Sequence, residues 1–340
     1  MRAEGAFSEA GPAWCKIRSF RPGHIMSQPV LEHIVCTLGD HAVRMGYWQW
    51  GEPAAGHVVL CVHGLTRQGR DFDALASELI EQAHQRGLPP LRIVCPDVPG
   101  RGQSAWLPDP ALYQIPVYVQ GMVQLLTRLA QQAPVDTLDW VGTSMGGLIG
   151  MGLASLQGSA AWPAGVPSLA HLVLNDVGPQ ITHASVARIG AYAGDTGHYA
   201  SEAEALQALQ ERFAAFGPHT PEEWARLNRP MLRPHPAGGL RLHYDPALAD
   251  AFREVPREAF DAGTQVLWKL YDALSTPTLV IRGAESDLLT PEAAHAMQMR
   301  GPRAHVVEIA GAGHAPALDH AAEMQPIADF LLGSSDVSRV

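Results

Sequence analysis

The chain has 340 residues, of which 46% are hydrophobic and 17% charged, a composition typical of a globular protein whose core needs no disulfide or structural metal. Aspartate and glutamate number 34 against 24 lysine and arginine, so the formal net charge is −10. Such a surface repels nucleic-acid phosphates and anionic lipid, and the sequence has no apolar run long enough to span a bilayer. We therefore expect neither nucleic acid nor membrane as a partner.

The N-terminal segment and the cysteines both favour a cytoplasmic protein. Residues 1–30 mix charged, glycine and proline residues without the apolar stretch of a secretory signal, so we expect a disordered tail there. The cysteines are scattered and form no C-x-x-C pair, which argues against a disulfide framework. They are Cys15, Cys36, Cys61 and Cys95.

Short apolar runs alternate with longer helical patterns along the chain, which predicts a mostly parallel sheet covered by helices. Two more alternating segments, near residues 34–37 and 43–50, are expected to form an antiparallel edge. The apolar runs suit strands buried on both faces; they span residues 57–62, 91–95, 138–141, 169–174, 278–281 and 304–309. Helices are expected over residues 71–85, 115–132, 145–156, 291–299 and 321–332.

One long interval, residues 179–276, carries helix signals but no convincing strand. Ser201 and Glu204 have capping-box spacing, and Thr220-Pro221 opens another helix. A helical insertion between two strands of a sheet is typical of a cap, with a separate helical domain as the alternative. The expected organisation is a core of residues 31–178 and 277–340 with a helical cap of residues 179–276.

The strongest functional motif is Gly142-Thr143-Ser144-Met145-Gly146-Gly147, which directly follows a predicted strand and precedes a predicted helix. This context is the one that a nucleophile elbow requires. The glycines allow a tight turn that lifts the Ser144 hydroxyl clear of the sheet. Ser144 is therefore the candidate nucleophile; a glycine-rich helix packed close to the sheet is the alternative interpretation.

A serine nucleophile needs a base, and the base needs an orienting acid. His314 lies in a small-residue loop after the last predicted strand and is the candidate base. Asp287, in the loop after the strand at residues 278–281, is the expected acid. Asp176, after the strand at residues 169–174, is the alternative.

An oxyanion hole is expected from two backbone amides near Ser144. The amide of Met145 opens a helix, and the amide of Leu65 lies in the loop His63-Gly64-Leu65-Thr66 after another strand. We interpret His63 itself as a structural histidine that hydrogen-bonds within its own loop.

Four features together resemble the α/β-hydrolase superfamily, over about residues 34–332. They are the chain order Ser144, Asp287, His314, the elbow around Ser144, the His63-Gly64 loop, and residues 97–104. The resemblance implies an eight-stranded, mostly parallel sheet flanked by helices, with a helical cap after strand six. Residues 174–179 and 281–290 look like those of bacterial carboxylesterases and lactonase-like members.

A serine at the elbow argues against the members of this superfamily that use a carboxylate nucleophile. We predict hydrolysis of a carboxylic ester or lactone through an acyl-enzyme on Ser144. A carbon–carbon bond hydrolase and an acyltransferase of the same fold are alternatives, and a non-catalytic ligand-binding protein is the alternative of another class. The resemblance implies no metal and no organic cofactor, and the sequence has no H-E-x-x-H motif.

The expected substrate is a small, largely apolar ester. Aromatic residues of the predicted cap, among them Phe213 and Trp268, are candidates for lining its pocket. Arg67 follows the oxyanion loop and is a candidate for binding a substrate carboxylate, such as that of a short hydroxyacid oligomer. The sequence leaves the oligomeric state open.

Overall fold

A computed structural model describes residues 28–252 and 256–333 of the chain. Most of the predicted tail, residues 1–27, lies outside the described residues, as does Cys15. The other three cysteines are buried free thiols. None of the described helices has the length and apolar character that a bilayer span requires.

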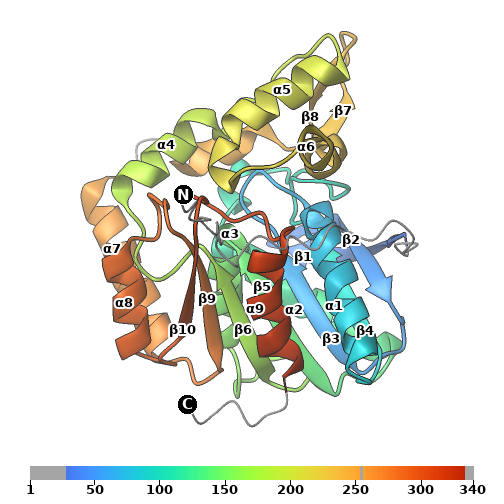
Figure 1. The fold of residues 1–340 in the computed structure, drawn as a ribbon, viewed down its shortest axis with the longest axis vertical. Coiled ribbons are helices and arrows are strands. Elements are labelled where there is room, and N and C mark those ends of the chain that lie inside the picture. Colours follow the sequence, from blue (N-terminus) through green and yellow to red (C-terminus); the bar gives the residue numbers. More distant parts are fainter. Residues whose placement is uncertain (1–27, 253–255, 334–340) are drawn as a thin grey trace, which may run out of the picture.

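An eight-stranded sheet forms the centre of the molecule (Figure 1). Its strands are β1 (Val30–Leu38), β2 (His41–Gly51), β3 (His57–Val62), β4 (Leu91–Pro96), β5 (Thr137–Thr143), β6 (Leu169–Asn175), β9 (Thr278–Gly283) and β10 (His305–Ile309). Their spatial order is β1-β2-β4-β3-β5-β6-β9-β10. The β1–β2 and β2–β4 pairs are antiparallel and the other pairs are parallel. The predicted mostly parallel sheet with an antiparallel edge is confirmed.

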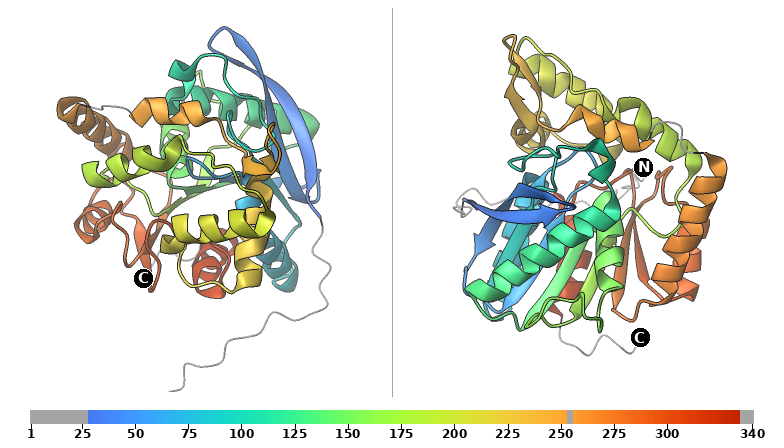
Figure 2. Two further views of the ribbon diagram at one scale, coloured as in Figure 1. Left: turned by 90° about the horizontal axis from the view of Figure 1, so that it is seen from above. Right: turned by 180° about the vertical axis from the view of Figure 1, so that it is seen from behind.

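The central strands are buried on both faces because helices cover each side of the sheet. Along β3, Val58 and Leu60 pack into one apolar cluster, whereas Val59 and Cys61 pack into a second one. Figure 2 shows the two helical layers from further directions. Helices α1 (Asp73–Gln85) and α9 (Ala321–Leu332) contribute to the second cluster, and α2 (Ile115–Gln132), α3 (Met145–Ala154) and α8 (Pro291–Met299) to the first.

Between β6 and β9 the chain forms an insertion at one end of the sheet (Figure 1). It contains α4 (His183–Ala193), α5 (Glu202–Arg212), α6 (Pro221–Asn228), β7 (Leu232–Pro234), β8 (Leu240–Leu242) and α7 (Arg257–Asp272). The expected helices are present, and Thr220 opens α6 with a complete capping box. The expectation of no strand was wrong: β7 and β8 pair as a short antiparallel ribbon. Three-residue strands are too short to produce a readable alternation.

Hydrogen bonds attach this insertion to loops at the carboxyl ends of the sheet strands. In the loop after β4, the Gly102 amide donates to His243 Nδ1 (2.7 Å). The Tyr113 hydroxyl donates to Asp245 Oδ2 (2.6 Å). Beyond β10, the Gly313 amide donates to the carbonyl of Ala215 (2.7 Å). The insertion is therefore fixed over the edge of the sheet where the loops after the parallel strands gather.

The turn from β5 into α3 depends on glycine because the backbone is crowded there. A Cβ on Gly146 would overlap the carbonyl oxygen of Val62, and a Cβ on Gly142 would overlap the backbone of Gly146. These contacts let α3 start directly against β3 and β5. The turn places Ser144 at the carboxyl end of the sheet.

We predict opposite effects for two glycine-to-alanine substitutions. Gly146→Ala should destabilise the fold by about 2 kcal/mol or more, because neither the added methyl group nor the Val62 carbonyl has room to move. Gly263→Ala, the matched control in the interior of α7, should stabilise by about 0.5–1 kcal/mol, because the site is open and helical. Urea unfolding of both variants measures these differences; equal effects would contradict the packing argument.

A buried carboxylate near the amino ends of the strands gives a second prediction. Asp139 accepts hydrogen bonds from His57 Nε2 (2.6 Å) and His171 Nδ1 (2.9 Å). Burial alone would raise the pKa of Asp139, but hydrogen bonds from His171 and His57 outweigh burial and lower it. A lowered folded-state pKa stabilises the fold above the unfolded-state value of about 3.9, and this contribution is lost as the pH falls through the folded-state pKa.

Asp139→Asn should therefore lower the free energy of unfolding at neutral pH by about 1–3 kcal/mol. The difference from wild type should shrink as the pH falls below about 4. Asp40→Asn, in an exposed turn, is the control and should change stability little. Chemical denaturation across the acid range measures the difference; a gap that does not depend on pH would contradict the assignment.

Candidate active site

Ser144 occupies the turn between β5 and α3 in a conformation that an L-residue rarely adopts, with φ of 52° and ψ of −117°. Its amide donates to the carbonyl of Asn175 (2.9 Å), which attaches the turn to the neighbouring strand β6. Its Oγ lies 2.9 Å from Nε2 of His314. Strain of this kind, held by surrounding contacts, is common at functional sites.

His314 lies in the loop between β10 and α9, and several backbone contacts fix that loop. The carbonyl of Ala312 accepts from the Glu285 amide (2.9 Å), and the carbonyl of Pro316 accepts from Asn175 Nδ2 (2.9 Å). The imidazole is nearly enclosed, with a side chain 9% exposed. The ring thus faces Ser144 with one nitrogen, while its Nδ1 lies 2.8 Å from Asp176 Oδ2.

Asp176 is the carboxylate that contacts His314. It is fully buried and directly follows β6, and its own φ is also positive, at 52°. Its Oδ1 accepts from the Gly283 amide (2.9 Å), and its Oδ2 accepts from the Ser286 hydroxyl (2.6 Å) as well as from His314. These donors hold the carboxylate in place, so one Ser–His–Asp series of hydrogen bonds runs across three loops.

This geometry corrects the expectation that Asp287 orients His314. The Asp287 side chain is 52% exposed and forms a two-pronged ion pair with Arg188 of α4, at 2.8 and 2.7 Å. The loop after β9 turns Asp287 outward and directs the preceding Ser286 toward Asp176 instead. The alternative position, Asp176, is the one that the structure brings to the histidine.

The sequence did not identify Ser286, although one signal was available for Asp176, which accepts its hydrogen bond. Parallel strands β5 and β6 are neighbours, and Thr143 pairs with Asn175 in their register. The next residue on each strand, Ser144 and Asp176, must therefore leave the sheet side by side. No comparable local signal identifies Ser286, because its role depends on the path of the β9 loop.

The amides of Leu65 and Met145 both point away from their own loops. The Gly64 carbonyl accepts from His63 Nδ1 (2.7 Å) and from the Arg67 amide (3.2 Å). In a trans peptide the N–H and C=O point in opposite directions, so the Leu65 N–H points away from those donors. The Ser144 carbonyl accepts in the same way from the Gly147 and Leu148 amides in the first turn of α3, which directs the Met145 N–H out of the helix.

Gly64, which precedes Leu65, lies beside the serine, since a Cβ built on it would be 3.7 Å from Ser144 Cβ, and Met145 directly follows the serine in the chain. Among the hydrogen bonds of the described residues, neither the Leu65 nor the Met145 amide donates to another protein group. Within the described part of the chain, both amides expected to bind an oxyanion are thus left without a protein acceptor, on residues next to Ser144 or to Gly64.

His63 has the structural role expected of it, and a buried arginine supports the same loop. Burial lowers the pKa of His63 to about 3. The positive charge of Arg101 also lowers this pKa, whereas the hydrogen bond to Gly64 raises it. The ring stays neutral, so its Nδ1–H donates to Gly64 while Nε2 accepts from the Val98 amide (2.9 Å). Arg101 is fully buried and donates to the Leu65 carbonyl (2.7 Å). Both residues fix the orientation of the Leu65 peptide.

Arg67 does not face a substrate, which corrects its assignment as a carboxylate-binding residue. It is buried, and its Nε and Nη2 donate to both carboxylate oxygens of Asp71, at 2.7 and 2.8 Å. Nη1 donates to Asn228 Oδ1 (2.9 Å) and Nη2 also to the carbonyl of Leu227 (3.2 Å). The guanidinium lies 4.9 Å over the Phe213 ring. Arg67 therefore joins the oxyanion loop to the insertion.

The two aromatic candidates are also engaged in packing. Phe213 is buried and stacks on Phe216 with ring centroids 5.1 Å apart, beneath the Arg67 guanidinium. Trp268, on α7, lies 3.9 Å beneath the guanidinium of Arg300 and donates to Gln180 Oε1 (3.3 Å). These contacts give both rings a structural role within the insertion and against α8.

A groove of about 660 Å³ lies away from this site, between α2, the end of α3 and α7. It is lined mainly by apolar residues such as Ile115, Val119 and Leu270, and neither Ser144 nor His314 borders it. We therefore do not assign the groove to the substrate of the Ser144 site.

Comparison with known proteins agrees with this architecture. Residues 59–324 match the alpha/beta hydrolase family. A 3-hydroxybutyrate-oligomer hydrolase from Cupriavidus necator is 44% identical over 311 residues, which cover 91% of this chain and 99% of that protein.

Two solved structures are similar over nearly their whole length. A putative hydrolase from Rickettsia typhi has a TM-score of 0.75 at 30% identity, covering 91% of this chain and 100% of that one. An alpha/beta hydrolase from Novosphingobium aromaticivorans has a TM-score of 0.72 at 28% identity, covering 90% and 99%. With its sheet order, its elbow serine and these matches, the chain belongs to the alpha/beta hydrolase family.

Proposed function

We propose that this carboxylic-ester hydrolase cleaves the ester bonds of short 3-hydroxybutyrate oligomers, with Ser144 as its nucleophile. The observation that carries the proposal is the continuous contact from Ser144 Oγ through His314 to Asp176. The substrate class is supported by the 44% identity to the Cupriavidus necator oligomer hydrolase along 99% of that protein.

In the acylation step, His314 Nε2 takes the Ser144 proton as Oγ attacks the ester carbonyl carbon. Asp176 holds the imidazole in the tautomer that leaves Nε2 free, and it stabilises the imidazolium that forms. The amides of Leu65 and Met145 receive the negative charge on the carbonyl oxygen. The tetrahedral intermediate collapses, His314 protonates the departing alkoxide, and one oligomer fragment leaves as an alcohol.

In the deacylation step, the 3-hydroxyacyl group is an ester of Ser144. His314 removes a proton from a water molecule, whose oxygen attacks the acyl carbonyl, and the same two amides stabilise the second oxyanion. Collapse breaks the bond to Oγ, which takes the proton back from His314. The product is the free hydroxyacid, and the enzyme returns to its initial state.

We also propose that residues 179–276 act as a cap over this reaction. The support is that Ala215 of the insertion accepts a hydrogen bond from Gly313, the residue next to His314. Arg67 contributes a second attachment between the oxyanion loop and the insertion. Closure of such a segment would exclude water from the oxyanion and strengthen its hydrogen bonds.

The first experiment compares wild type with Ser144→Ala. Wild type should react with a fluorophosphonate probe and convert the 3-hydroxybutyrate dimer and trimer to monomer, measured by chromatography. The variant should lose both properties while retaining its unfolding transition. Hydrolysis of simple nitrophenyl esters with no cleavage of the oligomers would support ester hydrolysis by Ser144 and refute the proposed substrate class.

The same assay separates the alternative reactions. Added alcohol acceptors would be converted to new esters in preference to hydrolysis if the protein were an acyltransferase. Cleavage of a substrate's carbon–carbon bond without ester hydrolysis would identify a carbon–carbon bond hydrolase. Folded wild type that neither reacts with the probe nor turns over any ester would favour the ligand-binding alternative.

A second prediction distinguishes the two aspartates. Asp176→Asn should lower kcat by about 10⁴-fold, because an amide at this position favours the wrong histidine tautomer and cannot stabilise the imidazolium. Asp287→Asn is the matched control and should leave kcat within about twofold, because only a solvent-exposed ion pair is lost. Steady-state kinetics on one ester decides between them. The reverse pattern would return the orienting role to Asp287.

A further inference from the structure

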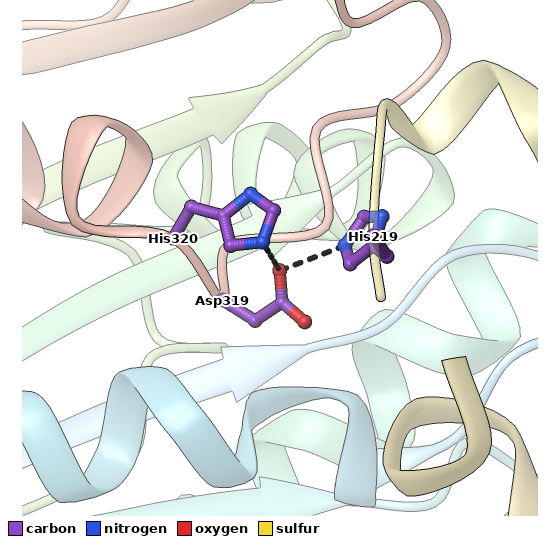
Figure 3. A group of neighbouring side chains, drawn as sticks. All are labelled: His219, Asp319 and His320. Carbon is purple, nitrogen blue, oxygen red and sulfur yellow. Dashed lines mark hydrogen bonds and ion pairs between the residues drawn. The ribbon is translucent and has the colours of Figure 1, made fainter. Parts of the chain in front are cut away.

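Three metal-ligating side chains gather outside the Ser144 site, where the insertion meets the core. His219 belongs to the loop before α6, and Asp319 and His320 lie between β10 and α9. Their ligand atoms lie within 4.8 Å of one another. Figure 3 shows a nitrogen of each imidazole turned toward the same carboxylate oxygen of Asp319.

The hydrogen bonds of His219 require a cation between its ring and Asp319. Its Nδ1 faces the Gly217 carbonyl at 2.9 Å, and a carbonyl only accepts, so Nδ1 carries a hydrogen. With that tautomer, Nε2 of a neutral ring presents a lone pair to Asp319 Oδ1 at 3.0 Å. Two acceptors at this distance repel each other unless a proton or a metal ion lies between them.

His320 adds a third potential ligand atom, which faces the same carboxylate oxygen of Asp319. Its Nε2 is 3.9 Å from Asp319 Oδ1, beyond hydrogen-bonding distance, and the two imidazoles are stacked with centroids 4.6 Å apart. Ligand atoms around a tetrahedral zinc ion are separated by about 3.3–3.6 Å, given metal bonds of about 2.0–2.2 Å. The separations of 3.0 and 3.9 Å bracket that value, and the two ligand nitrogens lie within 4.8 Å of each other, so a rotation of His320 would bring the three ligand atoms toward tetrahedral spacing.

We propose that His219, Asp319 and His320 bind one Zn²⁺ ion or a chemically similar divalent ion, which links the insertion to the core. Two imidazoles and one carboxylate suit such borderline metals, whereas Mg²⁺ and Ca²⁺ prefer oxygen ligands. The Nδ1–H···O=C contact of His219 is the arrangement that orients histidine ligands in metal sites.

The surroundings supply negative charge and a candidate fourth ligand. Glu223 Oε1 lies 3.7 Å from His320 Nε2, and its other oxygen is held by the Thr220 amide and hydroxyl. The opposing charge is Arg226, whose Nη2 is 3.5 Å from Asp319 Oδ2 and whose side chain is 42% exposed. Its exposure leaves it free to move aside.

An ion here would act on the loop that carries His314. Asp319 and His320 belong to the same β10–α9 segment as His314, and Gly217 of the insertion lies against Gly311 and Ala312 of that segment. His320 is 34% exposed, which gives an ion a route from solvent. Bridging both sides would hold the insertion against the catalytic loop.

The test is calorimetric titration of the chelator-treated, tag-free protein with ZnCl₂. We expect one saturable site per chain, no comparable heat with MgCl₂ or CaCl₂, and weaker binding as the pH falls, because protons compete for the imidazoles. Thermal unfolding of wild type should shift upward with Zn²⁺ and return with chelator. Absence of Zn²⁺ binding by the folded chain would mean that a proton alone occupies the cluster, and would overturn the proposal.

Matched variants locate the ion. His320→Ala, which keeps the buried His219–Asp319 pair, should weaken Zn²⁺ binding by about 10- to 100-fold or more, and His320→Cys should restore it. His235→Ala is the control, because His235 stacks on His198 elsewhere in the insertion. Each variant should retain its metal-free unfolding midpoint and its fluorophosphonate labelling. Unchanged binding in His320→Ala, or loss in His235→Ala, would place the ion elsewhere and refute the site.

Discussion

The register between β5 and β6 is the constraint on which the active site depends. Thr143 pairs with Asn175, so Ser144 and Asp176 leave adjacent strands at the same level. Both residues adopt positive φ, and each is held by backbone hydrogen bonds, Ser144 to Asn175 and Asp176 to Ile281. A shift of one residue between these strands would turn one of the two side chains to the opposite face of the sheet and separate the serine from the carboxylate.

Around this pair, buried polar groups fix the surrounding loops and the carboxylate of Asp176. His63 and Arg101 hold the peptide of Leu65, Asn175 holds the His314 loop, and Ser286 holds Asp176. Each has a satisfied hydrogen bond in a low-dielectric interior, where such bonds are strong and directional. The result is a site whose donors and acceptors are oriented before a substrate arrives, which is the condition for electrostatic stabilisation of an oxyanion.

Charged and polar contacts, in addition to apolar packing, attach the insertion to the core. Arg67 connects Asp71 of the core to α6, and His219 connects the loop before α6 to Asp319. Both connections end near the segments that carry Leu65 and His314. The position of the insertion and the geometry of the Ser144 site are therefore mechanically related.

The sequence by itself indicated the chain order of the sheet strands and of the helices that cover them, the turn at Ser144 and the candidacy of His314, because these depend on local patterns of apolar residues, glycines and turns. It also indicated the Leu65 and Met145 amides, since each follows directly from a strand end. Only the tertiary structure decided whether Asp176 or Asp287 contacts His314. It also showed that Arg67 binds residues of the insertion, where the sequence had suggested a contact with substrate. Those outcomes depend on the path of the β9 loop and on where α6 docks, and side chains distant in sequence set both.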